Sequence, residues 1–245
     1  MSGLDEILEQ SIASHTGRMV LGRALAAIGL TVLAMASALA GDPAQIVVED
    51  WSRLVPGTTG IPDGWTGQTW GTPRYDFTVV GDDGAGAALR LRSRDDNSTI
   101  SKEVRVDTRR FPILTWRWKM VTLPRGGDAR RRETDDQAGQ LYVAFPRFPA
   151  ALRSRILGYV WDTTAPVGTV VQSASVRAVT YVVVRSGTAE VGRWVAETRD
   201  VHADYRGIYG EEPAEEVRVV SVAIDSNDTR SSAEAYIGAI RFRAR

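Results

Sequence analysis

Two neighbouring aspartates, Asp135 and Asp136, form the first group of side chains that could do chemistry. They follow a charged loop at 125–133 and precede an apolar, strand-like run at 140–145. Adjacent carboxylates repel each other, so both stay ionised only near cations or in water. We therefore expect one of two arrangements. Asp136 accepts backbone N–H groups in a solvated turn, or the carboxylates lie at a cleft mouth and bind sugar hydroxyls or a cation.

A second group lies in the stretch WVAETRDVHADY at 194–205. Arg199 paired with Asp200 or Asp204 would hold a turn in place. Alternatively, Glu197 or Asp200 is a general acid or base, which requires burial or a like-charged neighbour to raise its pKa. An enzyme with two catalytic carboxylates would draw them from Asp136, Glu197, Asp200 and Asp204. Such a pair lies about 5–5.5 Å apart in retaining glycosidases and about 6.5–9.5 Å apart in inverting ones.

A third group, Asp225, Asn227 and Asp228, places three short oxygen-bearing side chains within four positions. Calcium takes six to eight oxygen ligands, so a structural calcium ion is one interpretation. The spacing does not match an EF-hand loop, and a turn rich in Asp and Asn between two strands explains the same residues. Apart from this calcium ion, we expect no cofactor.

Tryptophans supply a fourth signal. Trp65 and Trp70 lie in a loop dense in Gly, Pro and Thr at 55–73, and Trp161 ends an apolar run. An exposed indole beside carboxylates and amides can stack on a sugar ring while the polar groups bind its hydroxyls. The alternative is that Trp65 and Trp70 cap an open end of the fold. Trp116 and Trp118 lie on a regular strand and are expected in the core.

Composition excludes several classes of protein. The chain has 245 residues, 30 Lys+Arg against 30 Asp+Glu, two histidines and no cysteine. The balanced charge argues against a nucleic-acid partner. The lack of cysteine removes disulfides, thiolate nucleophiles and Cys-based zinc sites.

The N-terminus has the three parts of a secretory signal. Arg18 and Arg23 flank the start of an uncharged apolar run at 24–36, and small residues at Ala38 and Ala40 follow. The run is shorter than the roughly 20 residues that span a bilayer, which makes an uncleaved membrane anchor the second choice. We expect a signal peptide at 1–40 that is cleaved after Ala40, with translation starting at Met1 or Met19. The mature protein would be periplasmic or secreted, with no membrane span and one domain at 41–245.

Alternating apolar and polar residues predict strands over most of that domain. The predicted strands are 88–94, 113–121, 140–145, 156–161, 176–185, 193–201, 217–225 and 235–243. Short helices are expected at 201–210 and 146–155. The pattern favours an all-β fold, an antiparallel two-sheet jelly-roll-like sandwich with one or two short helices. A closed eight-stranded barrel is the alternative.

Several motifs together resemble a bacterial family, domain of unknown function 3047, over roughly Val48 to Phe242. The motifs are LTWRWK (114–119), LP (123–124), DD (135–136), YVAF (142–145), YVW (159–161), RDV (199–201), DY (204–205), GE (210–211), DSNDT (225–229) and AYIG (235–238). Gln140 stands where the family usually has arginine. The resemblance implies an exported protein with no established activity. The closing strand at 236–242 also resembles galactose-binding-like jelly rolls, which commonly bind carbohydrate and often hold calcium.

Three functional hypotheses follow. The leading one is an exported glycan-binding domain, which we expect to be monomeric. Its ligand-binding residues would be Trp65, Trp70, Trp161, Asp135, Asp136, Glu197 and Arg199. The alternatives are a glycoside hydrolase or polysaccharide lyase with paired carboxylates, and a structural or assembly protein of the cell envelope.

Overall fold

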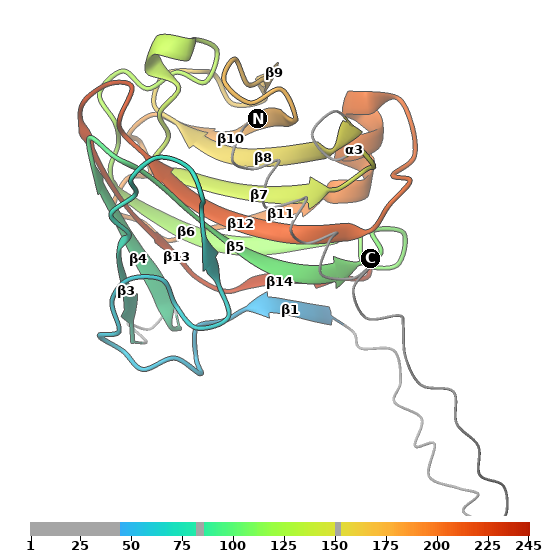
Figure 1. Cartoon of the computed structure of the whole chain (residues 1–245), viewed down its shortest axis with the longest axis horizontal. Helices are drawn as coiled ribbons and strands as arrows, with labels where there is room; N and C mark the ends of the chain where they lie inside the picture. The colour runs from blue at the N-terminus through green and yellow to red at the C-terminus, as the bar shows by residue number, and fades with distance from the viewer. Residues whose placement is uncertain (1–44, 82–85, 150–152) are drawn as a thin grey trace, which may run out of the picture.

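The computed structural model describes residues 45–81, 86–149 and 153–245. The signal peptide expected at 1–40 therefore lies outside the described residues. The described strands form two packed sheets (Figure 1), which confirms the two-sheet sandwich and not the closed barrel. None of the helices in this part of the chain is long and apolar enough to cross a membrane.

The first sheet has the strand order β1-β14-β6-β13-β4-β3. A seventh strand, β11, lies off this path and pairs with β6. Its strands are β1 (Gln45–Glu49), β3 (Asp76–Val80), β4 (Ala88–Arg94), β6 (Ile113–Thr122), β11 (Val195–Asp200), β13 (Ser232–Ile237) and β14 (Ile240–Arg243). In β6, Leu114, Trp116, Trp118 and Met120 are buried and alternate with more exposed residues, as the sequence predicts.

The second sheet has the order β2-β5-β12-β7-β8-β10-β9. Its strands are β2 (Thr66–Gly67), β5 (Asn97–Val106), β7 (Gly139–Phe145), β8 (Arg155–Asp162), β9 (Val170–Gln172), β10 (Val179–Ser186) and β12 (Val217–Asp225). Among the described strand pairs, β8 and β10 alone run parallel. Between β8 and β10 in the sequence, the chain forms β9, which pairs antiparallel with the edge of β10 that faces away from β8. When the chain turns back from β9 into β10, β10 runs in the same direction as β8.

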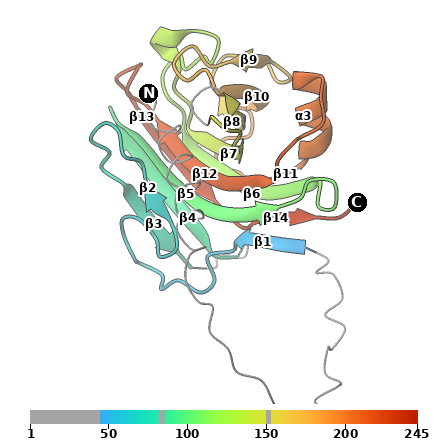
Figure 2. The same ribbon diagram turned by 45° about the vertical axis from the view of Figure 1, so that its right-hand side comes forward.

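One short helix, α3 (Val201–Tyr209), follows β11 directly and confirms the first of the two expected helices. The Asp200 side chain caps its N-terminus by accepting a hydrogen bond from the Ala203 N–H, and Gly210 ends it with φ 70°. The expected helix at 146–155 falls partly on residues 150–152, outside the described residues. Figure 2 shows α3 beside the β8–β10 end of the second sheet.

The molecule has two apolar clusters. The larger one fills the space between the sheets and contains Trp51, Trp118, Tyr159, Trp161 and Phe242 among its fully buried side chains. The smaller one lies on the opposite face of the second sheet, where Ile156, Val160 and Val183 are buried. Loop residues Ala129 and Ala165 cover it. The second sheet is therefore apolar on both faces over much of its width.

Candidate functional site

The outward face of the second sheet carries a row of side chains in register. Ser101 of β5 lies opposite Ser221 of β12, which lies opposite Tyr142 of β7. Gly158 of β8 then separates Tyr142 from Tyr181 of β10. The two tyrosine rings lie 6.5 Å apart between centroids. Of this row, Tyr142 and Tyr181 form the floor of the candidate site.

Gly158 is the residue that lets the two tyrosines approach each other. A Cβ atom at this position would lie 2.8 Å from Cε1 of Tyr142 and 3.1 Å from Cδ1 of Tyr181. Both distances are shorter than ordinary carbon contacts. A larger residue at 158 would therefore displace one of the rings.

A chain of hydrogen bonds links this floor to Asp135. The Tyr142 hydroxyl donates to Oε1 of Gln140 over 2.7 Å, and Nε2 of Gln140 donates to Oε1 of Gln137 over 2.8 Å. Nε2 of Gln137 then donates to Oδ1 of Asp135 over 3.0 Å. The Tyr181 hydroxyl reaches Oδ2 of Asp135 at 3.4 Å. Asp135 is thus held by one donor from β10, Tyr181, and one from its own loop, Gln137.

Asp135, Gln140 and the two tyrosines line a cavity of about 570 Å³. Its lining includes Gln68, Trp70, Asp95, Asp96, Asn97, Thr99, Asp135, Gln140, Tyr142, Tyr181, Asp225, Asn227 and Asp228. Trp70 is half-buried and packs against the smaller apolar cluster. A partly exposed indole therefore lies beside amides, hydroxyls and carboxyl groups in one hollow.

Burial raises the pKa values of Asp135 and Asp225, two of the five aspartates in the cavity wall. It raises the pKa of Asp135 to about 7, with a further contribution from the negative charge of Asp228. Burial and the neighbouring Asp136 also raise the pKa of Asp225 well above its usual range. The Asn97 amide donates to Oδ2 of Asp225. A protonated carboxyl group both donates and accepts hydrogen bonds, as a sugar hydroxyl does.

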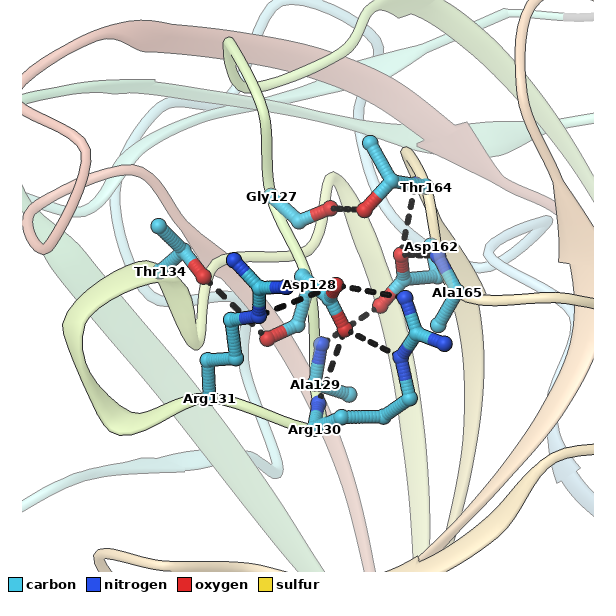
Figure 3. Close-up of polar contacts among 9 residues, drawn as sticks. All are labelled: Gly127, Asp128, Ala129, Arg130, Arg131, Thr134, Asp162, Thr164 and Ala165. Carbon is cyan, nitrogen blue, oxygen red and sulfur yellow. Dashed lines mark hydrogen bonds and ion pairs between the residues drawn. The ribbon is translucent and has the colours of Figure 1, made fainter.

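A hydrogen-bonded cluster around Asp162 (Figure 3) holds the loop that leads into Asp135. Asp162 is fully buried and accepts hydrogen bonds from the N–H groups of Ala129, Thr164 and Ala165 at 2.6–2.8 Å. The Thr164 hydroxyl donates to the Gly127 carbonyl over 2.9 Å. The end of β8 thereby ties down the loop that leads into Asp135.

Asp128 and Gly127 complete this loop. Asp128 accepts hydrogen bonds from Nε and Nη2 of Arg130, which lower its pKa to about 2. The N–H groups of Asp128 and Asp136 both donate to the Thr134 carbonyl. A Cβ at Gly127 would lie 2.4 Å from the Asp136 carbonyl oxygen, so only glycine fits this close approach.

Sequence comparison now assigns the chain to a family. Residues 63–241 match the family described as "Protein of unknown function (DUF3047)". The chain belongs to this family. No curated protein matches it.

Several solved structures are similar to this member of the DUF3047 family at low identity. The family 11 carbohydrate-binding module of a Clostridium thermocellum cellulase is 7% identical, covers 82% of this chain and 95% of its own, and has a TM-score of 0.40. The CBM22-1 xylan-binding domain from Paenibacillus barcinonensis is 11% identical over 83% and 97%, with a TM-score of 0.38. A variant of the Cel12A cellulase of Rhodothermus marinus is 12% identical over 82% and 99%, with a TM-score of 0.43.

Of the three predicted tryptophans, the structure places Trp70 alone at the cavity. Trp65 is 6% exposed, stacks on Trp51 and donates to Glu49 over 3.1 Å. Trp161 is fully buried and donates to the Gly187 carbonyl. The structure corrects the expectation for Trp65 and Trp161, because a ring enclosed in the core presents no face to a sugar.

The predicted residues of β11 and α3 lie away from this cavity. Glu197 accepts hydrogen bonds from the Trp118 indole and from Nε of Arg185. Arg199 forms an ion pair with Asp204 at 2.5 Å, and the Tyr159 hydroxyl donates to the same carboxylate. Glu197 and Arg199 thus have structural partners and do not join Asp135, which corrects their assignment as ligand-binding residues of one site.

The proposed catalytic pool is not assembled in one cleft either. Asp200 caps α3 and pairs with Arg245, while Asp204 pairs with Arg199. Asp136 is fully buried and accepts the N–H groups of Asp228 and Thr229 at 3.1 and 2.6 Å. Each carboxylate of the pool therefore has a local partner. The prediction that Asp136 bonds backbone N–H groups is confirmed.

The stretch at 225–229 forms a turn at the cavity rim. Asp225 accepts the Asn227 N–H over 3.3 Å, and the Asn227 amide donates to Asp228. The described residues contain no group of three or more His, Cys, Asp or Glu side chains placed to hold a metal ion. A calcium ion at Asp225, Asn227 and Asp228 stays a prediction.

The sequence patterns did not identify Gln140, Tyr142, Tyr181 and Asn97 as residues of the site. The signal was present in β7, where Gln140 and Tyr142 alternate with Leu141 and Val143 and so lie on the opposite face. It was hidden because that face has an apolar cluster of its own, which makes the strand apolar on both sides.

Proposed function

We propose that this protein binds a glycan in the cavity on the outward face of the second sheet. One observation carries the proposal, namely the joint presence of Trp70, the tyrosine floor and hydrogen-bonding carboxyl and amide groups in a single hollow. Carbohydrate recognition uses an aromatic face for the sugar ring and fixed polar groups for its hydroxyls. A hollow of this size also falls within the usual range for small-molecule sites.

The cavity favours binding over glycoside hydrolysis. A glycosidase needs one carboxyl group as an acid and a second, ionised one as a base or nucleophile. Burial raises the pKa values of both Asp135 and Asp225. This environment favours the neutral form of Asp135 and Asp225 at mildly acidic pH, and neutral carboxyl groups suit hydroxyl recognition.

The test of this function is native affinity electrophoresis of the purified protein in gels that contain soluble envelope and extracellular polysaccharides. We expect one or more polysaccharides to retard the protein, and Trp70→Ala to weaken that retention by about tenfold, equivalent to about 1.4 kcal/mol of lost stacking. Trp194→Ala is the matched control, because Trp194 is also half-buried but lies just before β11 of the first sheet, beside Tyr236. Equal retention of the wild type and Trp70→Ala would contradict the proposal.

We also propose that the protein is exported, on the strength of the signal-like segment at 1–40. The full-length protein expressed in a bacterium is expected to appear outside the cytoplasm with Gly41 as its first residue. N-terminal sequencing of the exported material tests this. A protein retained in the cytoplasm with an intact N-terminus would contradict export without affecting the glycan-binding proposal.

A further inference from the structure

A second cavity, of about 470 Å³, lies beside the C-terminal end of α3. It shares no residue with the cavity described above. Its lining comprises Arg147, Arg153, Ser154, Arg155, Gln172, Arg177, Ala178, Thr180, Tyr209 and Glu211. Four guanidinium groups therefore face one carboxylate, which leaves a net charge of +3 from these residues (4 − 1). This excess of positive charge favours the binding of a negatively charged ligand.

Two of the arginines converge on a single oxygen atom. Nη1 of Arg147 donates to Oε1 of Glu211 over 2.6 Å, and Nη1 of Arg155 lies 2.7 Å from the same oxygen. The Arg155 Nη1 atom is buried and has no hydrogen-bond acceptor. Its contact with Glu211 is therefore an ion pair without hydrogen-bond geometry. A buried donor is thus left without an acceptor in this cavity.

Packing fixes the position of Arg155. Its guanidinium lies 4.2 Å from the centre of the Tyr209 ring and 5.6 Å from the centre of the Tyr205 ring. Tyr209 is held in turn by a hydrogen bond to Thr180 over 3.2 Å. A guanidinium packed against two aromatic rings loses little further freedom when it binds an anion.

The charges of the other two arginines are not neutralised by ion pairs with described residues. Arg153 donates to the Phe148 carbonyl over 3.3 Å, and neither Arg153 nor Arg177 forms an ion pair with any described residue. Four planar donor forks around one hollow match the geometry of an oxyanion.

We propose that this cavity, the arginine pocket, binds an oxyanion such as a phosphate group or the carboxylate of an acidic sugar. Glu211 would compete with the ligand for this pocket, because its carboxylate pairs with N–H groups of Arg147 and Arg155 that the ligand would bind. The arginine pocket is independent of the glycan cavity and of the function proposed for it.

Isothermal titration of the full chain with inorganic phosphate, sulfate and glucuronate, at one fixed ionic strength, tests the proposal. We expect saturable binding of at least one of the three, and their ranking distinguishes a tetrahedral anion from a sugar carboxylate. Glu211→Gln is expected to tighten binding by about tenfold, since it removes the competing charge. Arg177→Gln is expected to weaken binding by about tenfold, since it removes one charge-assisted donor.

Arg94→Gln is the matched control, because Arg94 is an exposed arginine on β4 outside the arginine pocket. It is expected to bind as the wild type does. The proposal is overturned if none of the three anions binds, if Arg94→Gln weakens binding as much as Arg177→Gln, or if Glu211→Gln binds no more tightly than the wild type. The opposite effects expected of the two pocket variants also separate recognition from a general loss of folding.

Discussion

Asp162→Ala is expected to lower the free energy of unfolding by about 3–5 kcal/mol. The Asp162 carboxylate is fully buried and accepts the N–H groups of Ala129, Thr164 and Ala165. Alanine would leave these three donors without their acceptor, and an unsatisfied buried donor costs about 1–3 kcal/mol. Urea denaturation of the wild type and the variant measures the difference.

Asp76→Ala provides the control for that experiment. Asp76 is half exposed and pairs with Arg92 over 2.9 Å on the surface, where such pairs contribute about 0–1 kcal/mol. If Asp162→Ala proved no more destabilising than Asp76→Ala, the loop cluster of Figure 3 would not hold the loop that carries Asp135.

Asp135→Asn is expected to change how stability depends on pH. Folding raises the pKa of Asp135 from 3.8 to about 7 because the carboxyl group is buried. The folded state therefore holds a proton that the unfolded state releases between these two values, and the wild type loses stability as pH rises through this window. A shift of about three units corresponds to about 4 kcal/mol. Asparagine does not titrate and is free of this loss.

Urea denaturation at several pH values between about 4 and about 8 measures this effect. The stability of Asp135→Asn relative to the wild type should rise across the window and level off near the upper end. Asp63→Asn, which removes an exposed loop aspartate, controls for the loss of one carboxylate. If the difference in the free energy of unfolding between Asp135→Asn and the wild type stayed constant across this pH range, Asp135 would not be a buried carboxyl group with a raised pKa.

Eight segments of strand and the helix were predictable because their signals are local, whereas β3 and the ten-residue β5 were not among the predicted strands. Alternation places Leu89 and Leu91 on the buried side of β4, whose bounds match the prediction. Asp200 and Gly210 mark the ends of α3 by capping chemistry. The ion pair between Arg199 and Asp204 also follows from their spacing around the first turn of α3.

The site was less predictable because it depends on which face of a strand is covered. Trp161 belongs to the interior because it shares a face of β8 with Tyr159, and the sequence does not say which face packs against the first sheet. Likewise, Asp135 and Asp136 are adjacent, yet Asp135 lines the cavity while Asp136 binds the turn at 228–229. The pairing of Tyr142, Gly158 and Tyr181 across three strands is a tertiary feature with no local signal.

Isothermal titration calorimetry with an oligosaccharide cut from a retained polysaccharide decides whether the outward-facing cavity is a glycan site. We expect one binding site per chain, with affinity about tenfold weaker in Trp70→Ala and unchanged in Trp194→Ala. Equal affinities for the wild type and Trp70→Ala, or no saturable heat from the folded wild type, would contradict the account.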